Sequence, residues 1–206
     1  MIIVSLKSEA AGELNRIELS DGSLFSFRIC YLPPEINNTD ICDSNTAAGR
    51  EITAVEEAAF RHASDCLRAE KTALRLIARA EQCSLGLVRK LEKRGHDTVC
   101  VNAVISRLTE LRLLDDSRFA RLWLESRLRY ARSPRRLLSS LCGRGIDRDD
   151  AEAALKTALD EEAESAMLAR FVKKHARKAG DTHSLKHLLK SESFSPQAIR
   201  RFFDEE

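Results

Sequence analysis

The spacing of apolar residues changes along the chain. Near the start, the segments Ile17–Leu19 and Leu24–Ile29 are short, β-prone and partly alternating between apolar and polar residues. The Asp-Gly pair at 21–22 lies between them and is a strong hairpin signal. This pattern predicts a small β meander over residues 1–32. The polar stretch 33–50 that follows has the composition of a linker.

From about residue 51 onward, apolar residues recur at spacings of three and four, which is typical of amphipathic helices. This part repeats itself: Leu91–Asp97 matches Leu141–Asp147, and Leu189–Ser195 is a degraded third copy. Repeats of about fifty residues, built of short helices, favour a helical array. We therefore expect an all-α main body of three tandem three-helix repeats, forming an elongated curved array after the β meander. The expected boundaries are a leading helix over 51–70 and repeats over 71–116, 117–163 and 164–206.

The repeated segment has a physical interpretation. Gly95 and Gly145 suit the left-handed backbone position that follows the end of a helix. Two residues later, Asp97, Asp147 and Ser195 are expected to accept free backbone N–H groups as N-caps of the next helix. Further helix starts are expected at Ser84, Ser133 and Asp181.

The net charge becomes informative about function only when it is calculated separately for each region of the chain. The 206 residues contain 34 Lys and Arg and 32 Asp and Glu, and the formal net charge of +2 taken alone argues against nucleic-acid binding. However, residues 1–60 carry −6, residues 61–148 carry +10 and residues 149–206 carry −2. Six arginines and no acidic residue lie between positions 127 and 144. Such a run cannot neutralise itself locally and must face solvent or a polyanion.

We expect this basic region to bind phosphate. Ser133 and Pro134 open a helix whose free N–H groups favour an anion, and neighbouring guanidinium groups supply forked donors. The alternative is a solvated face with a few ion pairs. Aromatic residues make up only 5% and do not interleave with the arginines in the sequence, so no stacking platform for single strands is expected. The candidate DNA- or filament-binding residues are Arg89, Lys90, Lys93, Arg94, Arg127, Arg129, Arg132, Arg135, Arg136 and Arg144.

Motifs for catalysis, cofactors or metals are not found. The sequence has no G-x-S-x-G, P-loop or G-x-G-x-x-G motif. The six cysteines lack C-x-x-C spacing and are interpreted as reduced thiols, most of them in the core. His183 and His187 could share one helix face, but no third ligand follows, and solvated histidines are the simpler interpretation. We therefore expect no cofactor, no catalytic residue and no metal site.

Two other groups of residues have simple structural explanations. The Asp115-Asp116 pair could bind a metal, but helix capping accounts for it more simply. Phe119 and Trp123 are expected in the core.

The N-terminal sequence lacks a signal-peptide pattern, and no apolar run approaches the ~20 residues of a membrane span, so we expect a cytoplasmic protein.

The segment Leu113–Ala120, with the sequence Leu-Leu-Asp-Asp-Ser-Arg-Phe-Ala, resembles a signature of the RecX family of bacterial recombination regulators. The resemblance covers residues 70–160 well and the third repeat more weakly. The sequence departs from the family pattern at Ser193, which replaces a glycine, and at Arg112, where a glycine is common. Other segments that resemble the family are Ala73–Arg79, Leu91–Gly95, Arg132–Leu137 and Leu141–Ile146.

The resemblance implies a non-enzymatic regulator of the RecA recombinase, active in DNA repair and the SOS response. Such a protein lodges in the groove of the RecA filament on DNA, blocks filament extension and promotes disassembly, so that strand exchange, ATP hydrolysis and coprotease activity fall. Its implied partners are RecA and single- and double-stranded DNA, bound without sequence specificity and in a salt-dependent way. Two alternatives stay open: a sequence-specific regulator of helix-turn-helix type, and a helical-repeat adaptor for another protein.

Overall fold

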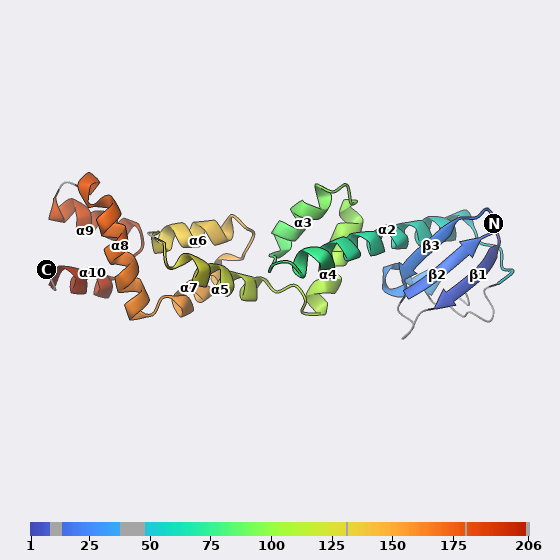
Figure 1. Cartoon of the computed structure of the whole chain (residues 1–206), viewed down its shortest axis with the longest axis horizontal. Coiled ribbons are helices and arrows are strands. Elements are labelled where there is room, and N and C mark those ends of the chain that lie inside the picture. Colours follow the sequence, from blue (N-terminus) through green and yellow to red (C-terminus); the bar gives the residue numbers. More distant parts are fainter. Residues whose placement is uncertain (9–13, 38–47, 131, 180, 205–206) are drawn as a thin grey trace. The chain divides into compact units, whose positions relative to one another are not determined.

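The structure, a computed structural model, describes residues 1–8, 14–37, 48–130, 132–179 and 181–204 (Figure 1). Most of the segment interpreted as a linker, residues 38–47, lies outside the described residues. The chain divides into two compact units. Unit 1 comprises Met1–Glu81 and Leu87–Leu114, and unit 2 comprises Gln82–Gly86 and Asp115–Glu206.

Unit 1 begins with the predicted β meander. Strands β1 (Ile3–Ser8), β2 (Leu14–Leu19) and β3 (Leu24–Arg28) form an antiparallel sheet in the order β1-β2-β3. The turn between β2 and β3 uses the Asp-Gly pair: Gly22 has φ +84°, and the backbone N–H of Ser23 donates to the Asp21 carboxylate. Alternate residues of the strands, including Ile3, Ile17, Leu19, Phe25 and Phe27, are buried on one face of the sheet.

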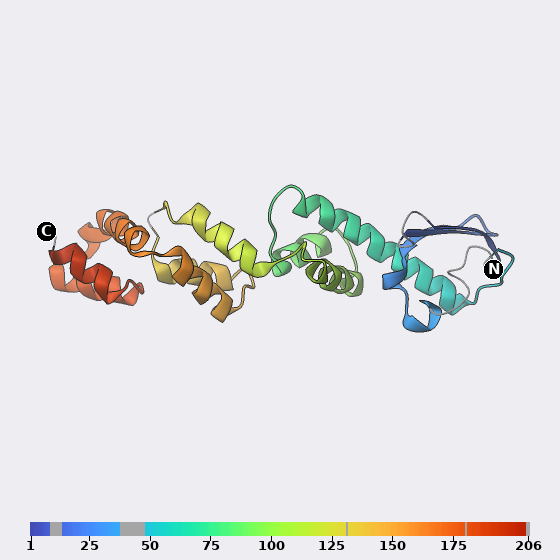
Figure 2. The ribbon, with the colours of Figure 1, turned by 90° about the horizontal axis from the view of Figure 1, so that it is seen from below.

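A long helix covers that face. After the short elements η1 (Ile29–Tyr31) and α1 (Pro34–Asn37), helix α2 runs from Ala54 to Ile77 and begins with a capping box between Thr53 and Glu56. Figure 2 shows the sheet edge-on with α2 along one face, where the Phe27 and Phe60 rings lie 5.2 Å apart. The second half of α2 packs against α4 (Thr98–Glu110). Thus α2 continues without a break through position 70, where the sequence pattern separates a leading helix from the first repeat.

A buried carboxylate joins these parts of unit 1. Glu70 of α2 is 2% exposed and accepts hydrogen bonds from the Arg28 Nε (2.9 Å) and the Tyr31 hydroxyl (3.2 Å). The Arg107 guanidinium of α4 lies 3.9 Å from its other oxygen. Burial, together with the nearby Glu70 charge, raises the pKa of Tyr31, so the hydroxyl remains a donor. A buried carboxylate needs such partners, and the sheet, α2 and α4 are therefore held in one arrangement.

The remaining helices are short and amphipathic. Helix α3 (Ser84–Glu92) precedes α4, and the side chains of Leu87, Leu91, Val101, Val104 and Leu108 are buried in the unit 1 core. In unit 2, Leu124, Leu137, Leu141, Met167 and Phe171 lie in a second core, and Phe119 and Trp123 pack against it, as predicted. The unit 2 helices are α5 (Asp116–Arg127), α6 (Pro134–Cys142), α7 (Arg148–Ala158), α8 (Glu161–Ala179), α9 (Thr182–Ser191) and α10 (Pro196–Asp204).

The predicted helix caps are confirmed. Asp97, Ser133, Asp147 and Asp181 each accept a backbone N–H at the start of a helix, and Ser195 accepts from the Ala198 N–H. Asp115 caps α5 in the same way, accepting from the Arg118 N–H at 2.9 Å. Asp116 accepts instead from the Ser84 N–H at the start of α3, at 2.7 Å. Both members of the acidic pair are therefore engaged in capping.

None of the described helices has the length and apolar character that crossing a bilayer requires.

Four turns in the chain share one geometry. Gly95, Arg112, Gly145 and Ser193 have φ of 81°, 55°, 85° and 64°, and each lies shortly after the last residue of a helix. In all four turns the N–H of the residue after the left-handed one donates to a carbonyl five residues earlier, as from His96 to Leu91 and from Phe194 to Leu189. The left-handed turn therefore persists at Arg112 and Ser193, where the sequence has no glycine.

Substitutions at these turns should separate backbone strain from steric clash. Gly145→Ala should lower the free energy of unfolding by more than about 2 kcal/mol, because the new Cβ would be strained at positive φ and would lie 2.6 Å from the Leu85 Cβ. Gly95→Ala, which meets no atom within 4 Å, should cost only the strain of about 1–2 kcal/mol. Ser193→Gly should stabilise by about 0.5–1 kcal/mol. Denaturant unfolding measures all three, and equal losses for the two alanine variants would contradict this account.

Candidate nucleic-acid interface

Unit 1 contains a basic surface pocket of about 410 Å³. One wall is formed by α2 and the other by the turn between α3 and α4. Four of its seven lining residues are cations at neutral pH, and none is an acidic residue or a Phe, Tyr or Trp. The lining residues are Arg68, Lys71, Thr72, Arg75, Arg94, Gly95 and His96.

The two walls are positioned by local geometry. Residues 68, 71 and 75 have spacings of three and four, so a single face of α2 presents their side chains. On the other wall, the left-handed conformation of Gly95 ends α3 and turns the chain toward α4. The Arg94 guanidinium donates to the Lys90 carbonyl at 2.7 Å, which fixes this cation beside the turn.

The pocket is electrostatically suited to an anion. Burial and the positive charges of Arg68 and Arg94 lower the pKa of His96, so its imidazole is neutral near pH 7. Part of the Arg68 charge is balanced by Asp65, 2.6 Å away on the same helix. Lys71 and Arg75 are exposed and supply further positive charge. An arrangement of cations without Phe, Tyr or Trp rings favours phosphate groups over bases.

Of the candidate DNA- or filament-binding residues, only Arg94 lines this pocket. Arg89, Lys90 and Lys93 are exposed on α3 and just after it. The predicted candidates did not include Arg68, Lys71 and Arg75, which lie outside the dense arginine run between positions 127 and 144. Their helical spacing was the available signal.

A second group of candidate residues surrounds two aromatic rings in unit 2. The Arg144 and Arg127 guanidinium carbons lie 4.7 Å and 5.7 Å from the Trp123 ring centroid. Those of Arg129 and Arg127 lie 5.4 Å and 5.9 Å from the ring of Tyr130. Helical spacing places Arg127 and Arg129 beside these rings, and the helix end before Gly145 adds Arg144, so the sparse aromatic residues of this region contact arginines in the fold.

These contacts divide the arginines by role. Within the described residues, the Nε of Arg127 is buried and has no hydrogen-bond partner, so this side chain serves packing as well as charge. Arg144 is half-buried and donates to the Ser140 carbonyl at 2.7 Å. Arg129 is exposed beside Tyr130, where a cation–π contact is worth about 0.5–1 kcal/mol. Arg129 is thus the most available cation of this group.

The start of α6 differs from the phosphate site suggested by the sequence. The Ser133 hydroxyl donates to the Glu192 carboxylate, and the Arg135 N–H donates to the Glu192 carbonyl at 3.2 Å. The Arg136 Nε lies 4.0 Å from the same carboxylate, and the Arg135 guanidinium donates to the Ser191 carbonyl. Arg132 is half-buried nearby. The anion at this helix N-terminus is thus the protein's own Glu192, although Arg135 and Arg136 remain exposed.

The chain is similar to known proteins both in sequence and in fold. Residues 115–155 match the family model described as RecX, second three-helix domain. Regulatory protein RecX of Treponema pallidum (strain Nichols) is 36% identical over 154 residues, which cover 74% of this chain and 94% of that protein. A crystal structure of regulatory protein RecX aligns over 98% of both chains with a TM-score of 0.71 and 17% identity. RecX from Lactobacillus salivarius aligns over 68% of this chain and 96% of its own, with a TM-score of 0.56 and 20% identity. At these identities the two crystal structures show a shared fold.

Removing positive charge from the pocket should weaken binding to DNA and make that binding less dependent on salt concentration. The double variant Lys71→Gln/Arg75→Gln should lower affinity equally for unrelated sequences, and should make the log–log salt slope shallower by about 2, one for each lost phosphate contact. Fluorescence anisotropy over a salt series measures the slope. Arg61→Gln is the matched control on α2, since Arg61 is paired with Glu57 at 2.7 Å and lies outside the pocket. Equal salt slopes for the wild type, the double variant and Arg61→Gln would exclude phosphate binding in the pocket.

The pocket should also take up a proton when it binds phosphate. His96 is neutral near pH 7 in the free protein because its pKa is lowered, and a bound phosphate would raise that pKa by stabilising the imidazolium. DNA affinity should therefore rise as the pH falls from about 7.5 toward 5.5. In His96→Gln, this part of the pH dependence should be missing. Superimposable pH profiles for the two proteins would contradict a role for His96.

Proposed function

The chain belongs to the RecX family of regulatory proteins, and on that premise we propose that it binds RecA–DNA filaments and inhibits RecA without chemistry of its own. The observation that carries the proposal is the 36% identity with a regulatory protein RecX over 94% of that protein's length. Inhibition would act on RecA-dependent ATP hydrolysis, strand exchange and coprotease activity together, because all three require an assembled filament.

We further propose that DNA phosphates bind at two basic clusters. The first is the pocket of unit 1 with the exposed Arg89, Lys90 and Lys93, and the second is the arginine group of unit 2 around Trp123 and Tyr130. Arg132, Arg135 and Arg136 would add charge beside the second cluster. Contacts of this kind fix position on the nucleic acid but carry no sequence information, so both single- and double-stranded DNA should bind.

The charge distribution supports a combined RecA and DNA partner over DNA alone. The +10 of residues 61–148 is offset by acidic flanks of −6 and −2, so the long-range attraction to bare DNA is limited. Glu192 also neutralises part of the charge at the start of α6. A protein that contacts both RecA and phosphate would combine two weak interactions into one tighter attachment.

A sequence-specific regulator of helix-turn-helix type is the second candidate, favoured by the capped helices and short turns. It would require base-reading side chains along a helix inserted into the major groove. The pocket cations instead flank a turn, and several unit 2 arginines are engaged with aromatic rings or with α9. This arrangement supports phosphate contact, and competition with scrambled DNA distinguishes the two candidates.

The proposal predicts that the purified protein lowers DNA-dependent ATP hydrolysis by RecA from the same cell. Lys71→Gln/Arg75→Gln should need a several-fold higher concentration for the same inhibition, whereas Arg61→Gln should match the wild type. On bare DNA, the wild-type salt slope should be roughly −4 to −5 if about six cations contact phosphates. Hydrolysis that is unchanged at a several-fold molar excess of the wild type would overturn the proposed function.

A further inference from the structure

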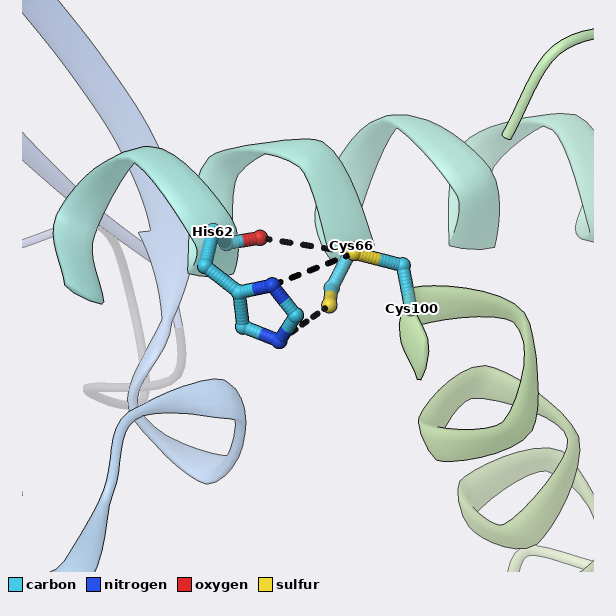
Figure 3. A group of neighbouring side chains, drawn as sticks. All are labelled: His62, Cys66 and Cys100. Carbon is cyan, nitrogen blue, oxygen red and sulfur yellow. Dashed lines mark hydrogen bonds between the residues drawn. The ribbon is translucent and has the colours of Figure 1, made fainter. Parts of the chain in front are cut away.

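Two cysteines and a histidine that are far apart in the sequence meet inside unit 1. His62 and Cys66 lie one turn apart on α2, and Cys100 lies in the first turn of α4 (Figure 3). One ligand atom from each of the three side chains can be chosen so that all lie within 4.8 Å of one another. The Cys66 Sγ is 3.5 Å from His62 Nε2, and the Cys100 Sγ is 3.5 Å from His62 Nδ1.

We propose that His62, Cys66 and Cys100 bind one Zn²⁺ ion, in a site that joins α2 to the start of α4. With Zn–S bonds of about 2.3 Å and Zn–N bonds of about 2.0–2.1 Å, tetrahedral geometry separates a sulfur from a nitrogen by about 3.6 Å. Each sulfur lies 3.5 Å from an imidazole nitrogen, which is close to that separation, but Cys66 faces Nε2 and Cys100 faces Nδ1. A single ion needs one imidazole nitrogen, so the ring would turn slightly to direct one nitrogen toward both sulfurs.

The chemistry of the donors favours a borderline-soft ion. Two thiolates and one imidazole form a ligand set suited to zinc, and the remaining position would take water or a nearby carboxylate. Asp65 and Asp97 are the acidic residues close enough to affect the Cys66 thiol electrostatically. The N-terminus of α4 adds partial positive charge beside Cys100, which opposes the effect of burial on its thiol.

Without an ion, the thiols are poorly suited to redox chemistry. Burial raises the pKa of both Cys66 and Cys100, and Cys66 is completely buried, so neither is a reactive thiolate near neutral pH. A divalent cation changes this balance because it replaces the thiol protons as it binds. His62 is half-buried and gives the cluster an approach from solvent.

The position of the site gives zinc a structural consequence. Arg68 follows Cys66 by two residues, and His96 precedes Cys100 by four, and both line the basic pocket. An ion shared by α2 and α4 would therefore fix the two walls of the pocket relative to each other. Zinc binding should raise the thermal stability of the protein, since the ligand set exists only in the folded chain.

The test is zinc titration of the full-length, reduced protein after chelator treatment, with affinity measured by competition against a chromogenic chelator. One zinc per chain is expected, and a hundredfold excess of free zinc over Kd should raise the unfolding midpoint by about 5–10 °C. Cobalt substituted for zinc should show a thiolate-to-cobalt charge-transfer band and the intense visible bands of a tetrahedral ion. Cys66→Ser and Cys100→Ser should each weaken binding at least about 100-fold, the upper range for losing an outer-shell group.

Two controls separate this site from other thiols and histidines. Cys142→Ser removes an exposed thiol in unit 2, and His183→Gln/His187→Gln removes an exposed pair with helical spacing. Both should bind zinc as the wild type does. The cobalt spectrum of the wild type decides the question even if a serine variant fails to fold. Absence of the thiolate band, or zinc binding retained by Cys66→Ser/Cys100→Ser, would overturn the proposal.

Discussion

The left-handed turn at the ends of α3, α4, α6 and α9 is the constraint on which the helical part of this protein depends. Each turn ends one helix, satisfies its last carbonyls with a five-residue hydrogen bond and redirects the chain. At Gly145 the packing of Leu85 leaves no space for a Cβ, which makes this turn a packing contact as well. At Ser193 a non-glycine residue adopts the same strained conformation, so the surrounding unit must hold it there.

The same turns determine where positive charge is presented. Arg94 precedes Gly95 and reaches the unit 1 pocket, while Arg144 precedes Gly145 and covers Trp123. A turn that lost its left-handed residue would therefore displace a cation as well as destabilise a helix end. In unit 1 the buried Glu70 adds a second constraint, since it fixes α2 against the sheet and α4 and so positions the pocket wall. The same few contacts therefore stabilise the fold and position the cations of the proposed interface.

Local features of the fold could be predicted from the sequence, whereas long-range features could not. Asp97 and Asp147 act as caps because capping needs only residues within one helical turn. The Glu192 carboxylate at the start of α6 is almost sixty residues from Ser133, so only folding reveals it. For the same reason, the sequence does not reveal that the α2 cations meet the turn before α4, or that His62, Cys66 and Cys100 lie together. Each combines one face of α2 with residues near the start of α4, and cysteine spacing along the chain gives no sign of this.

The proposed interface requires DNA to lie against the unit 1 pocket when RecA is present. A photo-crosslinking residue at Thr72, which lines the pocket, tests this directly, and Thr157 on α7 provides an exposed comparison site. Irradiation of RecA filaments on labelled DNA should produce a protein–DNA crosslink from position 72 that disappears at high salt. The yield from position 157 should stay at background. Equal yields from both positions, or no crosslink from position 72, would contradict the account.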